Sequence, residues 1–203
     1  MSLPVACLLT RWYSLSLEAT LQAIGFEDDV VSFINSIEAT ADVASSALAP
    51  DARAWAAQHV QQWRRCAASE TPLLIFQEDV VFASDATNVM EATKAMIVQE
   101  GMAAASDLLL FLGAASPDDA PQGLAKELAS SAGGGLVPVC SASPTCAYIL
   151  WPQAARTLLN SLPLDVPVAD YLSRHIAARK VVAVMAVPAL VRSEVVVASD
   201  DLT

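Results

Sequence analysis

The chain has 203 residues, enough for one sizeable domain, and 55% of them are hydrophobic whereas only 16% are charged. Eleven Lys and Arg residues against 22 Asp and Glu residues give a net charge of −11, which disfavours a general surface for nucleic acid or an anionic membrane. A small phosphorylated ligand is still compatible with this charge, because a bound metal ion supplies positive charge locally. We expect no signal peptide, because the apolar run within residues 1–9 is short and no basic residue precedes it, and no transmembrane helix, because no run approaches roughly 20 apolar residues. We expect one cytoplasmic domain over residues 1–203, with a frayed tail after about residue 194.

The cysteines and histidines give little sign of a metal centre. Four cysteines lie among apolar neighbours without C-x-x-C spacing: Cys7, Cys66, Cys140 and Cys146. Buried free thiols are the expected state, with two disulfide pairs as the alternative. His59 and His175 are the only histidines, so no zinc site is suggested.

The first third of the chain predicts one strand followed by helices. An apolar run predicts a strand over 4–9, and apolar residues at helical spacing predict a helix over 14–24 that Gly25 ends. In the acid cluster that follows, Asp29 is favoured as the cap of a short helix through Ile37, and metal binding is the alternative.

A longer helix is predicted from Asp51, as its N-cap, to about Ala67. This helix places Trp55, His59 and Trp63 at successive i+4 steps along one face. Core packing is the expected role of this face, with His59 as a hydrogen-bonded, half-buried side chain.

The stretch 73–82 combines an apolar run with two carboxylates. Its first half predicts a short strand buried on both faces, as in a parallel sheet. Glu78 and Asp79 then follow at the carboxyl end of the strand. In open α/β sheets ligands bind at that edge, and two adjacent carboxylates there can hold a divalent cation that carries a diphosphate. The alternative is that both acids simply begin a solvated turn.

The remaining segments continue the alternation of strands and helices. Apolar runs predict strands at 108–112, 136–139 and 146–150 and a β-branched run over 181–191, and amphipathic segments predict helices at 85–105, 124–129, 152–160 and 170–178. The glycines at 133–135 lack the spacing of a phosphate-binding loop and favour a plain loop. The alternation indicates an α/β sandwich with a mostly parallel sheet.

Several blocks, in this order, resemble glycosyltransferase family 25, which includes lipooligosaccharide and procollagen galactosyltransferases. The similar blocks are 59–63, 74–82, 107–113, 145–150, 154–159, 167–170 and 187–191. The resemblance implies a single GT-A-like, Rossmann-type domain with a mostly parallel sheet flanked by helices. It also implies a UDP-sugar donor such as UDP-galactose, a divalent cation such as Mn²⁺, a glycan or protein-linked acceptor, and transfer with inversion.

Four residues take roles from this resemblance. Glu78 and Asp79 match the second and third acids of the family motif and are the expected metal and nucleotide ligands, with Asp79 the better candidate. Asp170 matches the family's aspartate and is the candidate catalytic base, with a helix N-cap as the alternative. Arg11, after the first strand, is a candidate nucleotide contact or a plain surface arginine.

The sequence departs from the family pattern at the centre of the motif. Gln77 stands where the family has glutamate, which removes one negative charge from the site. A catalytically inactive relative that serves as an interaction module is therefore the main alternative. An unrelated flavodoxin-like binding domain is a third hypothesis, although the chain offers no phosphate loop for it.

Overall fold

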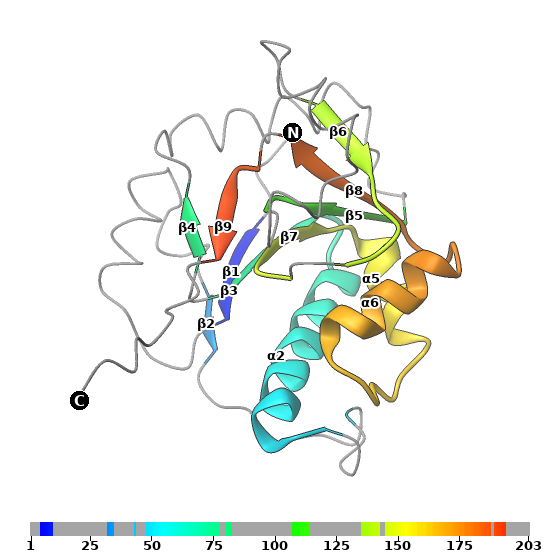
Figure 1. The fold of residues 1–203 in the computed structure, drawn as a ribbon. Coiled ribbons are helices and arrows are strands. Elements are labelled where there is room, and N and C mark those ends of the chain that lie inside the picture. The colour runs from blue at the N-terminus through cyan, green and yellow to red at the C-terminus, as the bar shows by residue number, and fades with distance from the viewer. Residues whose placement is uncertain are drawn as a thin grey trace, which may run out of the picture.

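The computed structural model describes residues 5–9, 32–34, 43, 48–77, 80–82, 107–113, 135–142, 145–187 and 189–193. These residues form an α/β fold with a seven-stranded sheet in the order β2-β1-β3-β7-β5-β8-β6 (Figure 1). The strands of this sheet are β1 (Val5–Leu9), β2 (Ser32–Ile34), β3 (Leu73–Gln77), β5 (Leu108–Phe111), β6 (Gly135–Pro138), β7 (Ala147–Leu150) and β8 (Val182–Val187). A separate two-stranded sheet pairs β4 (Val80–Phe82) with β9 (Val191–Ser193).

The large sheet is mixed, and the expectation of a mostly parallel sheet is wrong. β1 pairs in parallel with β2 and β3, and β5 pairs in parallel with β8. β7 runs antiparallel to both β3 and β5, and β6 runs antiparallel to β8. The apolar run of β7 is buried at every position, as a central parallel strand would be. Burial on both faces therefore does not encode the direction of a strand, which depends on its partners.

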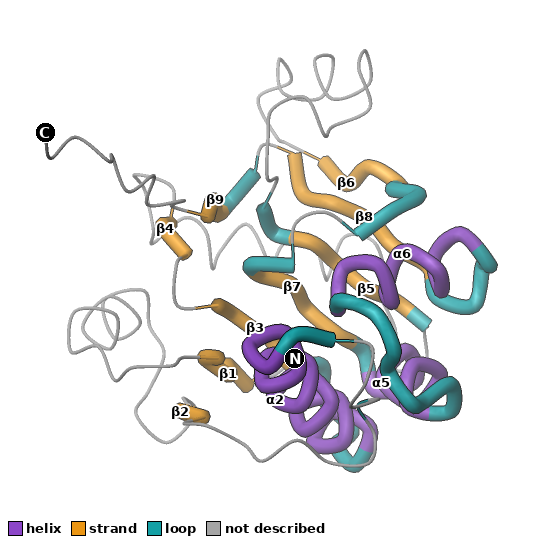
Figure 2. The backbone as a smooth tube through the Cα atoms, turned by 60° about the horizontal axis from the view of Figure 1, so that its bottom comes forward, coloured by secondary structure: helices purple, strands orange, loops and turns teal. Residues whose placement is uncertain are grey.

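Three helices in the described residues lie on one side of the sheet (Figure 2). They are α2 (Pro50–Ala67), α5 (Pro152–Leu159) and α6 (Val168–Ala177). Each agrees with a predicted helix to within two residues. Pro50 and Pro152 begin α2 and α5, where a missing N–H costs nothing. None of these described helices is long and apolar enough to cross a membrane.

Two local expectations in the first third of the chain are corrected. Asp51 lies in the first turn of α2, not at its N-cap, which is Ala49 and has no side-chain cap. The helix expected from Asp29 to Ile37 contains a strand instead, because Ser32–Ile34 pairs with β1. Tertiary pairing here overrides a weak local preference for helix. The helices expected at 14–24, 85–105 and 124–129 lie outside the described residues.

The core lies between the sheet and the helices. Alternate strand side chains such as Ile75 and Phe111 join Val60 and Trp63 of α2 in one apolar cluster. Neighbouring strand residues on the opposite face, such as Leu74, are also buried. His59 is 1% exposed, so it is fully buried, contrary to the half-buried side chain expected.

Cys66, Cys140 and Cys146 are free thiols, as expected. Cys66 and Cys146 are buried, but Cys140 is exposed, which corrects the expectation that every cysteine is buried. The short segment after β6 carries Cys140 to the surface, because the chain leaves the sheet there.

Candidate functional site

The parallel strands β1 and β3 end side by side. Leu9 and Gln77, their last residues, are register partners. Because both strands run the same way, the chain leaves the sheet from both at the same carboxyl edge. This edge is the one at which the sequence places the candidate site.

Gln77 is fixed at this edge by the segment that leads into β7. Its backbone N–H donates to the carbonyl oxygen of Cys146 at 2.7 Å. Its side-chain Nε2 donates to Oγ1 of Thr145 at 3.3 Å. The side chain of Gln77 therefore already has a polar partner within the protein.

The residues that follow Glu78 and Asp79 in the sequence form β4 of the small two-stranded sheet. Val80 pairs with Ser193 and Phe82 with Val191, in antiparallel register. Gly113 makes a bridge to Val191, and a Cβ on Gly113 would lie only 2.6 Å from the carbonyl oxygen of Val191. The glycine thus permits a close backbone approach that joins the small sheet to the end of β5.

Three of the predicted site residues, Arg11, Glu78 and Asp79, lie outside the described residues. Their nearest described neighbours are Leu9, Gln77 and Val80. Within the part of the chain that the structure describes, no group of three His, Cys, Asp or Glu side chains could hold a metal ion.

Asp170 is the one predicted site residue that the structure describes. It is an exposed residue in the first turn of α6, where its charge interacts favourably with the helix dipole. The N-cap of α6 is Pro167, without a side-chain cap, so the interpretation of Asp170 as an N-cap is wrong. Its side chain is open to solvent.

A buried polar network lies under the candidate edge. Tyr148 is the register partner of Ile75, two residues before Gln77, and its hydroxyl points to the helical side. Nδ1 of His59 hydrogen-bonds this hydroxyl at 2.6 Å, and Nε1 of Trp63 donates to it at 3.0 Å. The His59 and Tyr148 rings are stacked with centroids 5.8 Å apart. One phenolic oxygen therefore joins α2 to the sheet.

Burial keeps this network uncharged. It lowers the pKa of His59 from 6.5 to about 3, so the imidazole is neutral at neutral pH. With 1% of its surface exposed, His59 has no access to a substrate proton. Its role is to hold the layers together, not to act as an acid or base.

The network continues through aromatic contacts to α6. Trp63 stacks on Tyr171 at 5.7 Å, and Tyr171 contacts His175 at 4.5 Å between ring centroids. The Tyr171 hydroxyl donates to the Leu158 carbonyl at 2.7 Å. Burial, and then the charge of Asp165, raise the pKa of Tyr171 to about 12. The phenol therefore stays protonated and remains a hydrogen-bond donor.

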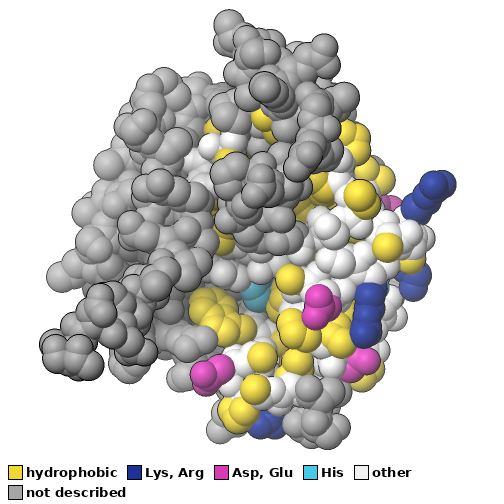
Figure 3. Space-filling view, in the orientation of Figure 1, with side chains coloured by type: hydrophobic (Ala, Val, Ile, Leu, Met, Phe, Trp, Pro, Cys, Tyr) yellow, Lys and Arg dark blue, Asp and Glu magenta, His cyan; other side chains and the backbone are white. Residues whose placement is uncertain are grey.

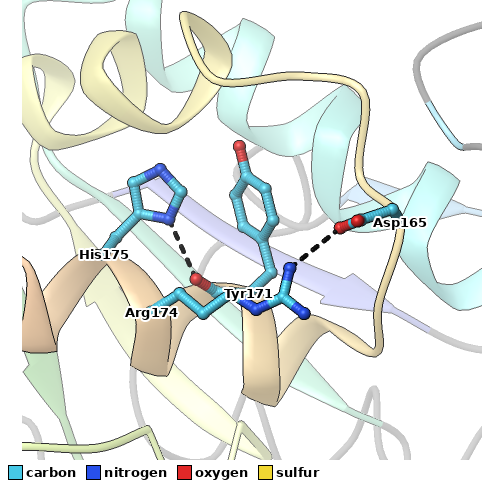
Figure 4. Close-up of polar contacts among 4 residues, drawn as sticks. All are labelled: Asp165, Tyr171, Arg174 and His175. Carbon is cyan, nitrogen blue, oxygen red and sulfur yellow. Dashed lines mark hydrogen bonds and ion pairs between the residues drawn. The ribbon is translucent and has the colours of Figure 1, made fainter.

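Two further contacts involve α6, one buried within the helix and one at its surface. Nδ1 of His175 donates to the carbonyl oxygen of Tyr171 at 2.9 Å. Arg174 forms an exposed ion pair with Asp165 at 3.1 Å, which anchors the segment before the helix (Figure 4).

Sequence reasoning placed His59 and Trp63 on one core face but missed Tyr148 as their partner. The signal that could have identified this partner is the hydroxyl of Tyr148, which is the one polar side-chain group within the apolar run of β7. No protein-family model matches the chain, and no curated protein matches its sequence.

Proposed function

We propose that the protein is a metal-dependent glycosyltransferase that moves a hexose, such as galactose, from a UDP-sugar to a hydroxyl of a glycan or protein-linked acceptor. The observation that carries the proposal is the pairing of Leu9 with Gln77 at the ends of two parallel strands. In the sequence, Glu78 and Asp79 follow Gln77 directly, and Arg11 comes two residues after Leu9. Carboxylates and a guanidinium that come directly after the ends of two neighbouring parallel strands are suitable groups for binding a nucleoside diphosphate and its cation.

The proposed roles follow from the chemistry of the leaving group. Asp79, with Glu78, would hold a divalent cation such as Mn²⁺, because carboxylate oxygens are suitable ligands for it. When bound, such a cation neutralises the charge that develops on the departing diphosphate. Arg11 would contact the same nucleotide. Asp170, an exposed carboxylate, would take the proton from the acceptor hydroxyl, as inversion requires.

One observation favours a second candidate, a catalytically inactive relative that serves as an interaction module. At the position of the family's first acid, the neutral side chain of Gln77 donates to Thr145. A site with one charge fewer holds a cation more weakly. In this alternative the protein keeps its fold, but the carboxyl edge of the sheet no longer supports transfer of the sugar.

Binding of UDP with and without Mn²⁺, measured by calorimetry and by thermal shift, tests the proposed site. The wild-type protein should bind UDP only when Mn²⁺ is present, and Asp79→Asn should abolish this binding. Glu70→Gln is a matched control, because Glu70 is an exposed acid in the turn before β3 begins. Tight binding of UDP without metal that survives Asp79→Asn would remove Asp79 from the site.

A transfer assay then separates the two candidates. Release of UDP from UDP-galactose or UDP-glucose in the presence of a sugar acceptor is expected of the enzyme, and Asp170→Asn should greatly reduce it. Metal-dependent UDP binding without turnover of either donor would favour the inactive relative.

A further inference from the structure

Two separate sheets hold the chain on either side of the acids Glu78 and Asp79. These two residues alone connect Gln77, the last residue of β3, to Val80, the first residue of β4. Gln77 belongs to the large sheet, whereas Val80 pairs with Ser193 of β9 in the small sheet. The placement of the two acids therefore depends on how the small sheet is held against the large one.

Strand β9 makes the connection between the two sheets. Val191 pairs with Phe82 of β4 and also forms a bridge to Gly113, two residues after the end of β5. The N–H groups of Leu190 and Val191 both donate to the carbonyl oxygen of Leu112, at 2.7 and 3.1 Å. Figures 1 and 2 show β4 and β9 side by side next to the large sheet. The position of β4 relative to β5 is thus set through β9.

The contacts that join β9 to the end of β5 are made by backbone atoms. The described Lys and Arg side chains that are visible in Figure 3 lie on the side of the helices, away from β4 and β9. A side chain can rotate to accommodate a small change in spacing, but a backbone atom in a strand cannot. A change in the space between β5 and β9 therefore has to move one of these two strands.

Gly113 lies against both of the groups that hold the acid pair in place. A Cβ on Gly113 would be 2.6 Å from the carbonyl oxygen of Val191 and 3.3 Å from Sγ of Cys146. The carbonyl oxygen of Cys146 in turn accepts the backbone N–H of Gln77 at 2.7 Å. One residue is therefore adjacent to β9, which pairs with β4 at Val80, and to the residue that fixes Gln77.

Lack of room, and not backbone conformation, accounts for a glycine at position 113. Its φ lies outside the left-handed region that favours glycine. A Cβ would come closer to the Val191 carbonyl than real Cβ atoms come to their neighbours, so any side chain would force the backbone to shift. Carboxylates that share one cation tolerate little displacement, because a binding site has to keep its geometry to within about 0.5 Å.

We propose that Gly113 is a positioning residue for Glu78 and Asp79. It acts through Val191 on the small sheet and through Cys146 on the end of β3. This inference rests on the proposed function, in which the two acids are the ligands of the divalent cation. Because coupling between two sites is reciprocal, a bound cation and nucleotide should also stabilise the contact of β9 with the end of β5.

Calorimetric titration of UDP in the presence of Mn²⁺ tests this role by comparing the wild type with Gly113→Ala. The substitution should weaken the affinity about tenfold or more, as changes in the groups that orient metal ligands do. Val137→Ala is the matched control, because it removes buried methyl groups from β6, at the far edge of the large sheet, and also lowers stability. It should change the affinity less than about twofold at a temperature at which circular dichroism shows all three proteins to be folded.

Hydrogen exchange in the wild-type protein tests the same inference without a variant, and decides it if Gly113→Ala does not fold. Mn²⁺ and UDP together should slow exchange of the Leu190 and Val191 N–H groups several-fold, because both bond to the Leu112 carbonyl across the contact in question. Exchange in β6 should not change.

Three outcomes would overturn the positioning role and leave the proposed function standing. They are equal affinities of Gly113→Ala and the wild type, an equal loss of affinity in Val137→Ala, and binding of UDP with Mn²⁺ that does not slow exchange at Leu190 and Val191. Failure of the wild-type protein to bind UDP in the presence of Mn²⁺ would instead remove the proposed function, and the positioning role with it.

Discussion

The hydroxyl oxygen of Tyr148 lies 2.6 Å from Nδ1 of His59, a residue 89 positions earlier in the chain. This contact joins a central strand to α2 in a fully buried environment. A polar pair in the core is satisfied in only one arrangement of helix and sheet, because each group needs its partner. The pair therefore helps to select the position of α2 over the strands that lead to the candidate edge.

The stability of the protein should fall as the pH drops below about 6.5. The pKa of His59 is about 3 in the folded protein against an ordinary 6.5, so the unfolded chain binds the extra proton between these values. Stability from this group is fully present above 6.5 and is lost as pH falls toward 3, at up to about 1.4 kcal/mol per pH unit. Urea denaturation across this range measures the slope, and His59→Gln should flatten it. Equal slopes in both proteins would exclude His59 as the cause.

Tyr148→Phe should destabilise the fold by about 1–3 kcal/mol, because it leaves the indole N–H of Trp63 and the ring nitrogen of His59 without the shared oxygen. Tyr171→Phe removes the hydrogen bond to the Leu158 carbonyl but leaves no buried N–H group without an acceptor, so it should lower the free energy of unfolding less. Chemical denaturation compares the two variants. A smaller effect for Tyr148→Phe than for Tyr171→Phe would contradict the shared-acceptor interpretation.

Gly113→Ala should lower the free energy of unfolding by about 1–3 kcal/mol. The added Cβ would lie 2.6 Å from the carbonyl oxygen of Val191 and would force β9 away from the end of β5. The obstacle is a backbone atom. Adding Val191→Ala should therefore fail to restore stability in denaturant titrations. Full recovery in the double variant would show that the valine side chain was the obstacle.

The described thiols should differ in reactivity. Cys140 is exposed, whereas burial raises the pKa of the Cys66 thiol to about 12 and the thiol donates to the Leu150 carbonyl at 3.2 Å. Iodoacetamide applied to the native protein, followed by peptide mass mapping, should modify Cys140 and leave Cys66 and Cys146 intact until denaturant is added. An adduct on Cys66 in the native protein would contradict its burial.

Gln77→Glu should strengthen Mn²⁺-dependent binding of UDP several-fold if the proposed site is correct, because it adds a negative charge at the end of β3. The fold should tolerate the change, since the Thr145 hydroxyl that now accepts from Gln77 can donate to a carboxylate instead. Calorimetry with Gln153→Glu, a change of equal charge on α5, provides the control. Equal affinities in all three proteins would argue against a cation at this edge.

Short-range patterns in the sequence were sufficient to locate most described elements. The apolar runs of β3, β5 and β7 are each four or five residues long and buried along their length, so a local pattern identifies them. Pro50 and Pro152 likewise mark the starts of two helices, because proline fits the first helical turn. The order of the blocks also suggested the function that we propose.

The sequence by itself determined where chain segments become strands and helices and which faces are apolar, because these properties depend on neighbouring residues. Only the tertiary structure decided the antiparallel direction of β7, the strand at Ser32–Ile34 and the pairing of Leu9 with Gln77. It also decided that His59 and Trp63 share the oxygen of Tyr148. Each of these depends on partners far away in the chain, and hydrogen bonds between distant segments leave little trace in local composition.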